Sequence, residues 1–460
     1  MSTNNYGSVA SEEDPLKGGE DLDDDECMEI EPLGKRLMDV VDKYWWLGCC
    51  AFGGPSAHVG LLRDHLVLQH NWIDEESFME LFALGQGLPG PSSTQLVIST
   101  AVTHGGPLGG IIAFFFWCLP AFTILTISGL FLYSVVDPSS PPIWLLGIPP
   151  AAVSIIFKAF YAFGLTLDKL GTALAMLACT AAVMINGDEH IPKTSSQIVY
   201  PALLILGGLT AYLDYSILKD KAIGNYSNVK PNDSGERTAK ERKLIKKVGI
   251  PIYAGVLMFL LWLVLFVGSI TLVNLGYTNE YLQIFEVFFR IGSIIYGGGV
   301  VVLPMLQSEL VPRGWMTNEQ FFQGLGLTQA MPGPLFNFSS FCGATYKGVL
   351  GAFIAEIGLF GPGYILIFAM VPFWTRIRHM AWFKVVLKGV NASAIGLIGS
   401  GCVFLYAAAV KTAADAMVFV IAGGLVSFYN VPVPAVIVVG AACGALFSSS
   451  VLDVGQVKYH

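Results

Sequence analysis

The hexapeptide QGLPGP at residues 86–91 recurs as QAMPGP at residues 329–334, with the same Gln, Pro, Gly and Pro at the same spacing. Both copies lie within long apolar runs, and a Trp stands fourteen residues upstream of each, at Trp72 and Trp315. Proline and glycine interrupt helices, so each copy predicts a helix break inside a membrane. Paired breaks in corresponding parts of a chain are the best sequence indication of the binding site of a membrane transporter.

The composition is that of a membrane protein. The 460 residues are 54% hydrophobic and 13% charged, with a mean hydropathy of +0.61, whereas soluble domains carry about 25% charged residues. Several windows are nearly free of charge and long enough to cross a hydrocarbon core of about 30 Å; they include residues 111–134, 251–275, 353–373 and 389–410. We therefore predict an all-α polytopic membrane protein in a lipid bilayer, and we expect the plasma membrane.

Further matches extend the repeat over most of the chain. Gly109 and Pro120 recur 242 residues later as Gly351 and Pro362. The chain therefore divides into two copies of one unit, each with about six helical segments, joined by one extra helix (about 13 segments in all). The predicted regions are a disordered acidic N-terminal tail (1–36), a first transmembrane repeat (37–218), a basic cytoplasmic linker (219–248), a connecting helix (249–275), a second transmembrane repeat (281–450) and a C-terminal tail (451–460).

Neither the N-terminal tail nor the cysteines indicate a functional site. Residues 11–31 hold eleven carboxylates against one Lys, which is too acidic and too poor in apolar residues to fold alone. Seven of the eight cysteines lie in apolar segments, where cysteine behaves as a small hydrophobe. The histidines form no ligand pattern, so we expect no metal, disulfide or cofactor.

Loop charges predict that the two units are inverted relative to each other. The linker carries nine Lys or Arg between residues 219 and 247, which places it in the cytoplasm. The single connecting helix then returns the chain to the opposite face. The loop at 137–142 in the first unit has no Lys or Arg, whereas its counterpart in the second unit has Arg376, Arg378, Lys384 and Lys388. Equivalent loops of opposite charge character belong on opposite faces.

The path of the chain through each break can be interpreted in two ways. Residues 76–88 and 92–105 each make roughly 20 Å of helix, too short to span a bilayer. They form either one broken crossing or a re-entrant hairpin. We favour the broken crossing, because a hairpin contributes no crossing and would make the number of crossings in the first unit odd. With an odd number of crossings and a cytoplasmic N-terminus, the basic linker would lie on the outer face of the membrane.

The breaks offer the chemistry of an anion site. A helix that starts just after a break presents free N–H groups and about half a positive charge, and two such ends supply roughly +1. Glutamines three residues before each first proline either contact the ligand or cap the broken helices, and the upstream glycines form a second irregular point or only allow close packing. The predicted binding residues are Gly53, Gly54, Gln86, Pro89, Gly90, Pro91, Ser92, Ser93 and Thr94 in the first unit, and Gly297, Gly298, Gln329, Pro332, Gly333, Pro334 and Asn337 in the second.

Four charged residues are further candidates. A dianion at the breaks needs a cation beyond the two helix ends, and Lys158, inside an apolar segment, is a candidate unless it snorkels to the membrane edge. For Lys347 we favour snorkelling. Glu356 is a candidate carrier of a coupling proton or the partner of a basic group, and Arg63 either guides anions inward or is a solvated loop charge.

The motifs together resemble the chromate ion transporter family, in its long, two-domain type. The residues that carry the resemblance are Phe52-Gly53-Gly54-Pro55, Arg63, Trp72, Gln86 and Pro89-Gly90-Pro91, repeated as Tyr296-Gly297-Gly298, Trp315, Gln329 and Pro332-Gly333-Pro334. The resemblance covers both repeat units and implies transport of chromate, a tetrahedral dianion shaped like sulfate, by halves of opposite orientation. The sequence departs from the pattern at Gly299, where the first copy has Pro55, and it lacks a second Arg at the position matching Arg63.

The favoured function is a secondary transporter of tetrahedral oxyanions, chromate and also sulfate, by alternating access driven by an ion gradient or the membrane potential. The alternatives are a passive anion channel and a sulfate-type anion exchanger with the same fold. An enzyme is not expected, since no acid pair or nucleophile–base pattern occurs at membrane depth. No nucleotide motif indicates direct use of ATP, and no nucleic-acid partner is expected. Import, efflux and assembly as a homodimer all stay open.

Overall fold

The computed structural model describes residues 32–52, 54–135, 143–187, 195–217, 251–295, 302–377 and 380–448. All regular secondary structure in these ranges is helical. Both predicted terminal tails and the basic linker lie almost wholly outside the described residues, as do Gly53, Gly297 and Gly298. The expectations for those parts stay predictions.

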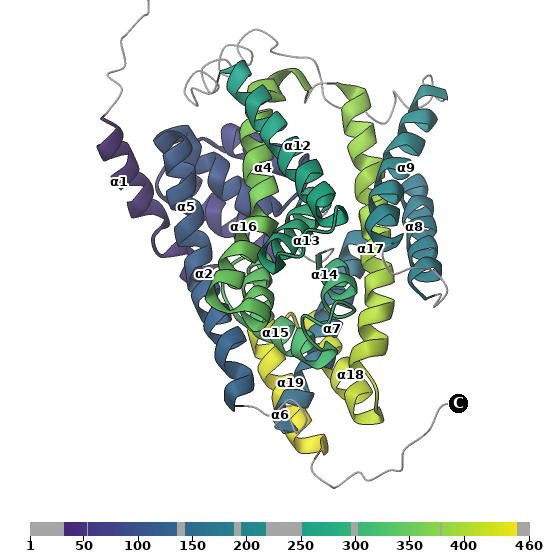
Figure 1. The fold of residues 1–460 in the computed structure, drawn as a ribbon. Coiled ribbons are helices and arrows are strands. Elements are labelled where there is room, and N and C mark those ends of the chain that lie inside the picture. Colours follow the sequence, from purple (N-terminus) through teal and green to yellow (C-terminus); the bar gives the residue numbers. More distant parts are fainter. Residues whose placement is uncertain are drawn as a thin grey trace, which may run out of the picture.

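Figure 1 shows the arrangement of the helices. The first unit contains α1 (Leu33–Tyr44), α2 (Leu47–Cys50), α3 (Gly54–Leu62), the π-helix η1 (Arg63–Gln69), α4 (Glu75–Gln86), α5 (Ser92–Val135), α6 (Ile143–Leu146), α7 (Ile148–Gly164), α8 (Lys169–Gly187) and α9 (Ser195–Ile217). The second part contains α12 (Ile252–Asn274), α13 (Glu280–Ile294), α14 (Val302–Leu310), α15 (Asn318–Ala330), the 3₁₀-helix η2 (Leu335–Asn337), α16 (Phe338–Ile377), α17 (Ala381–Ala409), α18 (Ala413–Phe428) and α19 (Val433–Ser448).

Five helical stretches among the described residues are long and apolar enough to cross a membrane: Ser92–Leu132, Trp144–Gly164, Ile252–Asn274, Leu335–Phe373 and Ala381–Ala409. Shorter apolar helices cover Lys169–Ile185, Ala413–Phe428 and Val433–Leu446. The protein is a helical membrane protein. The total of about 13 segments stays a prediction.

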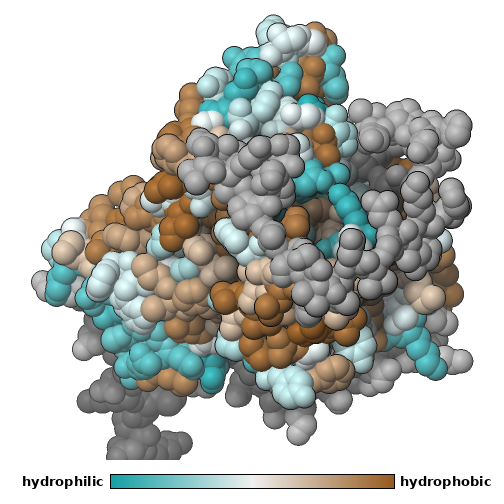
Figure 2. Space-filling view, turned by 90° about the horizontal axis from the view of Figure 1, so that it is seen from below, coloured by the Kyte–Doolittle hydropathy of each residue, from teal (hydrophilic) through white to brown (hydrophobic). Residues whose placement is uncertain are grey.

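Apolar side chains cover much of the outside. Only 6% of the membrane-length window in α12 is buried, and this helix lies on the outside of the bundle over α13 (Figure 1). Figure 2 shows broad hydrophobic areas at one end of the molecule, with hydrophilic side chains gathered in separate patches. A protein in water rarely exposes so much apolar surface, whereas a protein in a bilayer places such side chains against lipid.

Helices α5 and α16 each reverse direction within their length. Gly106 has φ 63° and ψ −162°, and Gly348 has φ 68° and ψ −157°, values that glycine adopts without steric cost. Gly109 packs against the carbonyl of Ala101, and Gly343 packs against Gly351, contacts that a straight helix excludes. Each helix is therefore a short arm (92–105 or 338–346) followed by a long arm (107–135 or 349–377) that returns along it.

The chain also turns back at both Pro-Gly-Pro breaks. Trp72 stacks on His104 with ring centroids 3.9 Å apart, and Trp315 stacks on Tyr346 at 4.7 Å. A continuous helical crossing would hold each pair roughly 45 Å apart. The favoured broken crossing is therefore wrong, and each break is the tip of a re-entrant hairpin. We call residues 75–105 and 318–346 the Pro-Gly-Pro hairpins.

Glycines make this reversal possible. Gly90 has φ 122° and Gly333 has φ 104°, a backbone region that only glycine enters easily. The flanking prolines prevent either arm from continuing as a helix. The arms then pack side by side: Gly85 lies against Gln95 in the first hairpin, and Gly324 lies against Phe341 in the second.

A second hairpin precedes each of these. In the first unit, Trp46 meets His65 edge to face at 5.1 Å. In the second unit, the Arg290 and Glu309 side chains form an ion pair of 3.3 Å. Both pairs span 19 residues, and the corresponding partners are 244 residues apart in the sequence. We call residues 33–69 and 280–310 the glycine hairpins, because these ranges contain the glycine motifs of the sequence.

Helices of the two units pack closely against each other. Gly147, just before α7, touches Gly440 of α19, and Gly389 of α17 touches Gly207 of α9. Glycine at these positions lets the backbones approach within contact distance. The contacts join α17 to α8 and α9 at one side of the molecule (Figure 1), and they hold the two units as one body around the hairpin tips.

Candidate functional site

The Pro-Gly-Pro tip of each unit forms a hydrogen bond with the glycine hairpin of the other unit. The backbone N–H of Gly90 donates to the carbonyl of Ile295 at 2.8 Å, and the N–H of Gly333 donates to the carbonyl of Ala51 at 2.7 Å. Ile295 and Ala51 occupy corresponding places, just before the glycine motifs. Each Pro-Gly-Pro tip is thus attached to the glycine hairpin of the other unit.

Each tip also lies against the long arm of the other unit. A Cβ added at Gly90 would lie 3.0 Å from the Cα of Gly363, and one added at Gly333 would lie 3.3 Å from the Cβ of Ala121. Ala121 and Gly363 correspond to each other in the repeat. Each break therefore contacts the other unit, and the two sets of contacts are reciprocal.

Polar side chains without partners follow the first break. Ser93, Thr94 and Gln95 are buried in the first turn of α5. The Gln95 side-chain amide donates to the carbonyl of Pro89 at 2.8 Å. The Gln95 Oε1 and Thr94 Oγ1 atoms have no hydrogen-bond partner among the described residues. Buried polar atoms without partners are costly, so these atoms point to a ligand or water.

His58 joins the first break to its surroundings. Its Nε2 lies 3.0 Å from the carbonyl of Ala51, which can only accept, so Nε2 donates. The neutral ring then accepts from the Ser93 hydroxyl at Nδ1, 3.3 Å away. His58 also meets Trp117 edge to face at 5.1 Å, and the Trp117 indole N–H has no partner in the described chain.

The second break has a matching set of groups. The Asn337 amide donates to the carbonyl of Cys118 at 3.4 Å, and its Oδ1 has no partner in the described ranges. The Ser339 hydroxyl donates to Glu356 Oε2 at 2.5 Å. The other carboxyl oxygen, Oε1, is also without a partner there. We call the combined set the tip cluster: His58, Ser93, Thr94, Gln95, Trp117, Asn337, Ser339 and Glu356.

The electrostatics of the tip cluster favour an anion. The short arms of α5 and α16 begin at the two tips, and free backbone N–H groups at a helix start carry about half a positive charge. The Thr94 hydroxyl and the Trp117 indole N–H add two donors, since neither has a hydrogen-bond partner among the described residues. Ser92 is half-buried at the start of α5.

The other predicted site residues differ in their surroundings. Gln86 is exposed on α4, and the Gln329 amide donates to the carbonyl of Ala152 on α7 at 3.2 Å. Gln329 therefore joins the second hairpin to α7, which neither alternative anticipated. Pro89 and Pro334 are buried at the tips, and Pro332 is half-buried.

The predicted cations are engaged elsewhere. The Lys158 ammonium donates to the carbonyl of Val426 on α18. The Lys347 ammonium pairs with Glu280 at the outer end of the second Pro-Gly-Pro hairpin. Arg63 forms an exposed ion pair of 2.7 Å with Glu75. Among these three, none contributes charge to the tip cluster.

Sequence reasoning missed His58, Gln95, Trp117 and Ser339. Gln95 carried a usable signal, because it stands four residues after Pro91 in the first turn of a broken helix. His58 and Trp117 have no counterpart of the same type in the second unit, so a search for repeated residues passes over them. Ser339 gains its role only from contact with Glu356.

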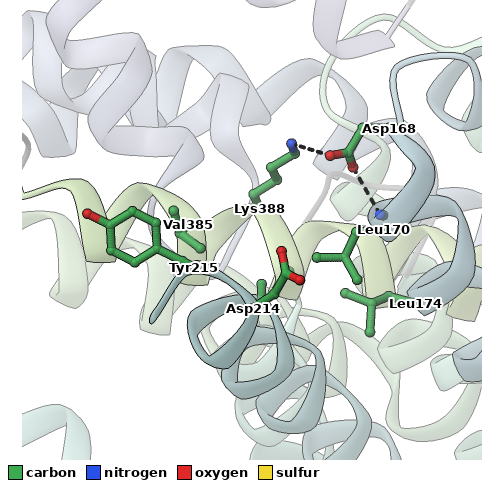
Figure 3. Close-up of a pocket in the computed structure, with 10 residues that line it drawn as sticks. Asp168, Leu170, Leu174, Asp214, Tyr215, Val385 and Lys388 are labelled. Atoms are coloured by element: carbon green, nitrogen blue, oxygen red, sulfur yellow. Dashed lines mark hydrogen bonds and ion pairs between the residues drawn. The ribbon is translucent and has the colours of Figure 1, made fainter. Parts of the chain in front are cut away.

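A hollow on the surface lies away from the tips (Figure 3). It is lined from the α7–α8 junction, α9 and α17, and the Lys388 ammonium pairs with Asp168 across it at 2.7 Å. This hydrogen bond lowers the pKa of Asp168. The break residues do not line the hollow. Exposed ion pairs of this kind hold segments together weakly, whereas the unpartnered buried groups make the tip cluster the better candidate.

Paired re-entrant hairpins whose tips surround unpartnered polar groups define the class of helical membrane transport proteins. Residues 38–212 and 282–445 match the family described as "Chromate transporter", and the chain belongs to this family. The two matched regions fall within the two predicted repeats.

Curated relatives resemble the chain over most of its length. It is 27% identical over 401 residues to the chromate transport protein of Pseudomonas aeruginosa (85% of this chain, 86% of that protein). It is 26% identical over 436 residues to a probable chromate transport protein of Synechococcus elongatus (93% and 99%). An uncharacterized transporter of Methanocaldococcus jannaschii is 25% identical over 363 residues (78% and 82%). No solved structure matches the chain.

Proposed function

We propose that the protein is a secondary transporter that carries chromate, and sulfate of the same shape, through the tip cluster. The observation that carries this proposal is the reciprocal bonding of the tips, Gly90 to Ile295 and Gly333 to Ala51, around buried polar atoms without partners. Membership of the chromate transporter family and the names of the relatives supply the substrate.

The donors of the tip cluster suit a tetrahedral oxyanion. Such an ion presents oxygens in four directions, and the cluster offers donors from several segments: the Thr94 hydroxyl, the Trp117 indole and two helix starts. Fixed dipoles and hydroxyls bind an anion without trapping it as a full cation does. An ion held in this way can be released on either side.

The hairpins also support an inverted arrangement of the units. Two hairpins enter and leave on the same face, so they add no crossing. In each unit they are followed by four helices, which are the long arm of α5 with α7, α8 and α9, and the long arm of α16 with α17, α18 and α19. An even number of crossings returns the chain to its starting face, and α12 then begins the second unit on the opposite face.

Alternating access follows from this arrangement. Tips that enter from opposite faces and meet midway leave the ion between two thin barriers, and a shift of one hairpin pair opens one barrier at a time. The membrane potential biases the movement by about 2.3 kcal/mol per charge per 100 mV. We place the protein in the plasma membrane, and the site within one chain, because both tip bonds are made inside one chain.

Cysteine labelling tests the hairpins and the inversion together. In a variant without native cysteines, we expect cysteines at Asn71 and Pro107 to react with an impermeant maleimide from one face of sealed vesicles, since they flank the first hairpin. Their counterparts at Gly314 and Val349 should react from the other face only. Labelling of Asn71 and Pro107 from opposite faces contradicts the hairpin, and labelling of all four from one face contradicts the inversion.

Flux through proteoliposomes tests the function. We expect saturable uptake of labelled chromate and sulfate, and at least a tenfold loss for Thr94→Val, which keeps the shape and removes an unpartnered buried hydroxyl. The control is Thr123→Val, because the Thr123 hydroxyl is exposed and bonds the carbonyl of Leu119 in its own helix. Uptake that rises linearly with concentration would indicate a passive channel. Equal rates for both variants would remove Thr94 from the site.

A further inference from the structure

Glu356 is the one acidic side chain of the tip cluster. It lies on the long arm of α16 with 6% of its surface exposed. Its Oε2 accepts the hydroxyl proton of Ser339, a residue of the short arm five positions after Pro334. Its Oε1 has no hydrogen-bond partner among the described residues. The carboxyl therefore has one satisfied oxygen and one free oxygen beside the second tip.

The elements around α16 offer no cation to this carboxyl within the described ranges. Cys118 of α5 is the titratable neighbour, and its carbonyl bonds Asn337. On α13, Glu286 and Arg290 bond each other. Helix α12 carries no charged residue.

The remaining neighbours of α16 place their charges elsewhere. At the start of α15, Glu319 pairs with Lys411. Helix η2 has no titratable side chain. Leu84 of α4 and Leu88, just beyond its end, pack in a cluster with Ile367 and Phe368 of α16, more than two helical turns from Glu356. The described groups thus leave the carboxyl unpaired.

We propose that Glu356 is the proton-binding group of the transporter and that the oxyanion binds together with a proton on this carboxyl. A carboxylate buried without a cation is strongly disfavoured, whereas the neutral acid is tolerated and gains a donor. An O–H at Oε1 donates to an anion oxygen, while a carboxylate at the same place repels the anion. Occupancy by the two ions is therefore linked, and each raises the affinity for the other. This inference rests on the proposed function.

The charge balance supports a proton carried with a dianion. The two helix starts supply roughly +1, and Lys158, Lys347 and Arg63 all bond away from the site. A dianion with one proton has a net charge of −1, which matches the helix ends. The proton comes from water on the side where the anion enters, resides on Oε1 during the passage, and returns to water when the anion leaves.

The repeat indicates one such proton for each anion. The position that corresponds to Glu356 in the first unit is Phe114, whose ring packs against Phe360 at 5.3 Å. Ser339 likewise corresponds to Leu96, 243 residues earlier. The acid and its hydroxyl partner therefore belong to the second unit alone.

Proteoliposomes with a lumenal pH dye test the inference on the full chain. For the unmodified protein we expect chromate uptake to move protons in the same direction, and an inward proton gradient of one pH unit to accelerate uptake about tenfold. The Glu356→Gln variant keeps a neutral donor but cannot release a proton. We expect it to exchange chromate for chromate across the membrane, with proton movement lost and no response to the gradient. The matched control is Glu280→Gln, whose carboxylate lies in the exposed pair with Lys347.

The possible outcomes distinguish a failure of this inference from a failure of the proposed function. Gradient-driven uptake with proton movement in Glu356→Gln overturns the inference and leaves the proposed function intact. Absence of chromate flux in the unmodified protein overturns the proposed function itself. If Glu356→Gln does not elute as a single species, Ser339→Ala serves instead. This change removes the hydroxyl that stabilises the charged carboxyl, so the proton-coupled rate should persist to higher pH, and an unchanged pH profile contradicts the inference.

Discussion

Alanine at Gly90 is expected to lower chromate uptake by at least tenfold. Gly90 has φ 122°, where a side chain costs about 1–3 kcal/mol in backbone strain. The added Cβ would lie 3.0 Å from the Cα of Gly363, an atom of the other unit's backbone. The tip must then shift, and the bond from its N–H to Ile295 is lost or lengthened. Uptake into proteoliposomes, normalised to correctly folded protein, measures the effect.

Two further glycines serve as comparisons. Gly333→Ala should be milder, since φ is 104° and the added Cβ would lie 3.3 Å from a side-chain carbon of Ala121 rather than from backbone. Gly268→Ala should leave uptake unchanged, because nothing lies within 4 Å of its added Cβ on α12. Full uptake by Gly90→Ala would show that the tip geometry does not control the passage of the ion.

Replacement of Arg290 by Met is expected to destabilise the protein by about 3–5 kcal/mol. Arg290 is 4% exposed. It pairs with Glu286 at 2.5 Å and with Glu309 at 3.3 Å, and Glu309 also pairs with Arg313. Loss of the guanidinium leaves the buried carboxylates of Glu286 and Glu309 with Arg313 as their one remaining cation among these ion pairs. Thermal unfolding in detergent measures the change, and Arg63→Met, at an exposed pair, should cost less than about 1 kcal/mol.

A compensated variant distinguishes the charges from the packing. Glu286→Gln and Glu309→Gln, added to Arg290→Met, should recover most of the lost stability, because no unpaired charge then remains buried. The first unit supports this expectation: at the places of Arg290 and Glu309 it has Trp46 and His65, joined by ring contact without an ion pair. Failure of the triple variant to recover would mean that the hairpin needs the ion pair itself.

Much of the fold could be predicted from local sequence. The charge-free runs identify membrane helices, and the repeated Pro-Gly-Pro places both breaks correctly, because proline and glycine act on their own backbone. Glu286 and Arg290, four residues apart on one face of α13, form an ion pair that the same local rule accounts for.

The direction of the chain after a break could not be read from the sequence. Two arms of about 13 residues fit a broken crossing and a hairpin equally well. The choice is made by Gly90 and Gly333 at positive φ and by the stacking of Trp72 on His104, residues 32 positions apart. Trp72 and Trp315 both close the base of a hairpin.

The candidate site shows the same limit. Residues inside the motifs could be proposed from the sequence, whereas His58, Gln95 and Ser339 join the candidate site through side-chain contacts. The sequence around Lys158 indicates apolar surroundings, but it does not indicate where the long side chain points. In the structure, the Lys158 ammonium donates to the carbonyl of Val426.

The reciprocal tip bonds have a consequence for synthesis. The carbonyl of Ala51 accepts from Gly333, and the N–H of Gly90 donates to Ile295, so partners of the first unit's tips leave the ribosome only after α12 has been made. Until then the N–H of Gly90 and the carbonyl of Ala51 lack these partners, so we expect the first unit to complete its packing only after the second has been made.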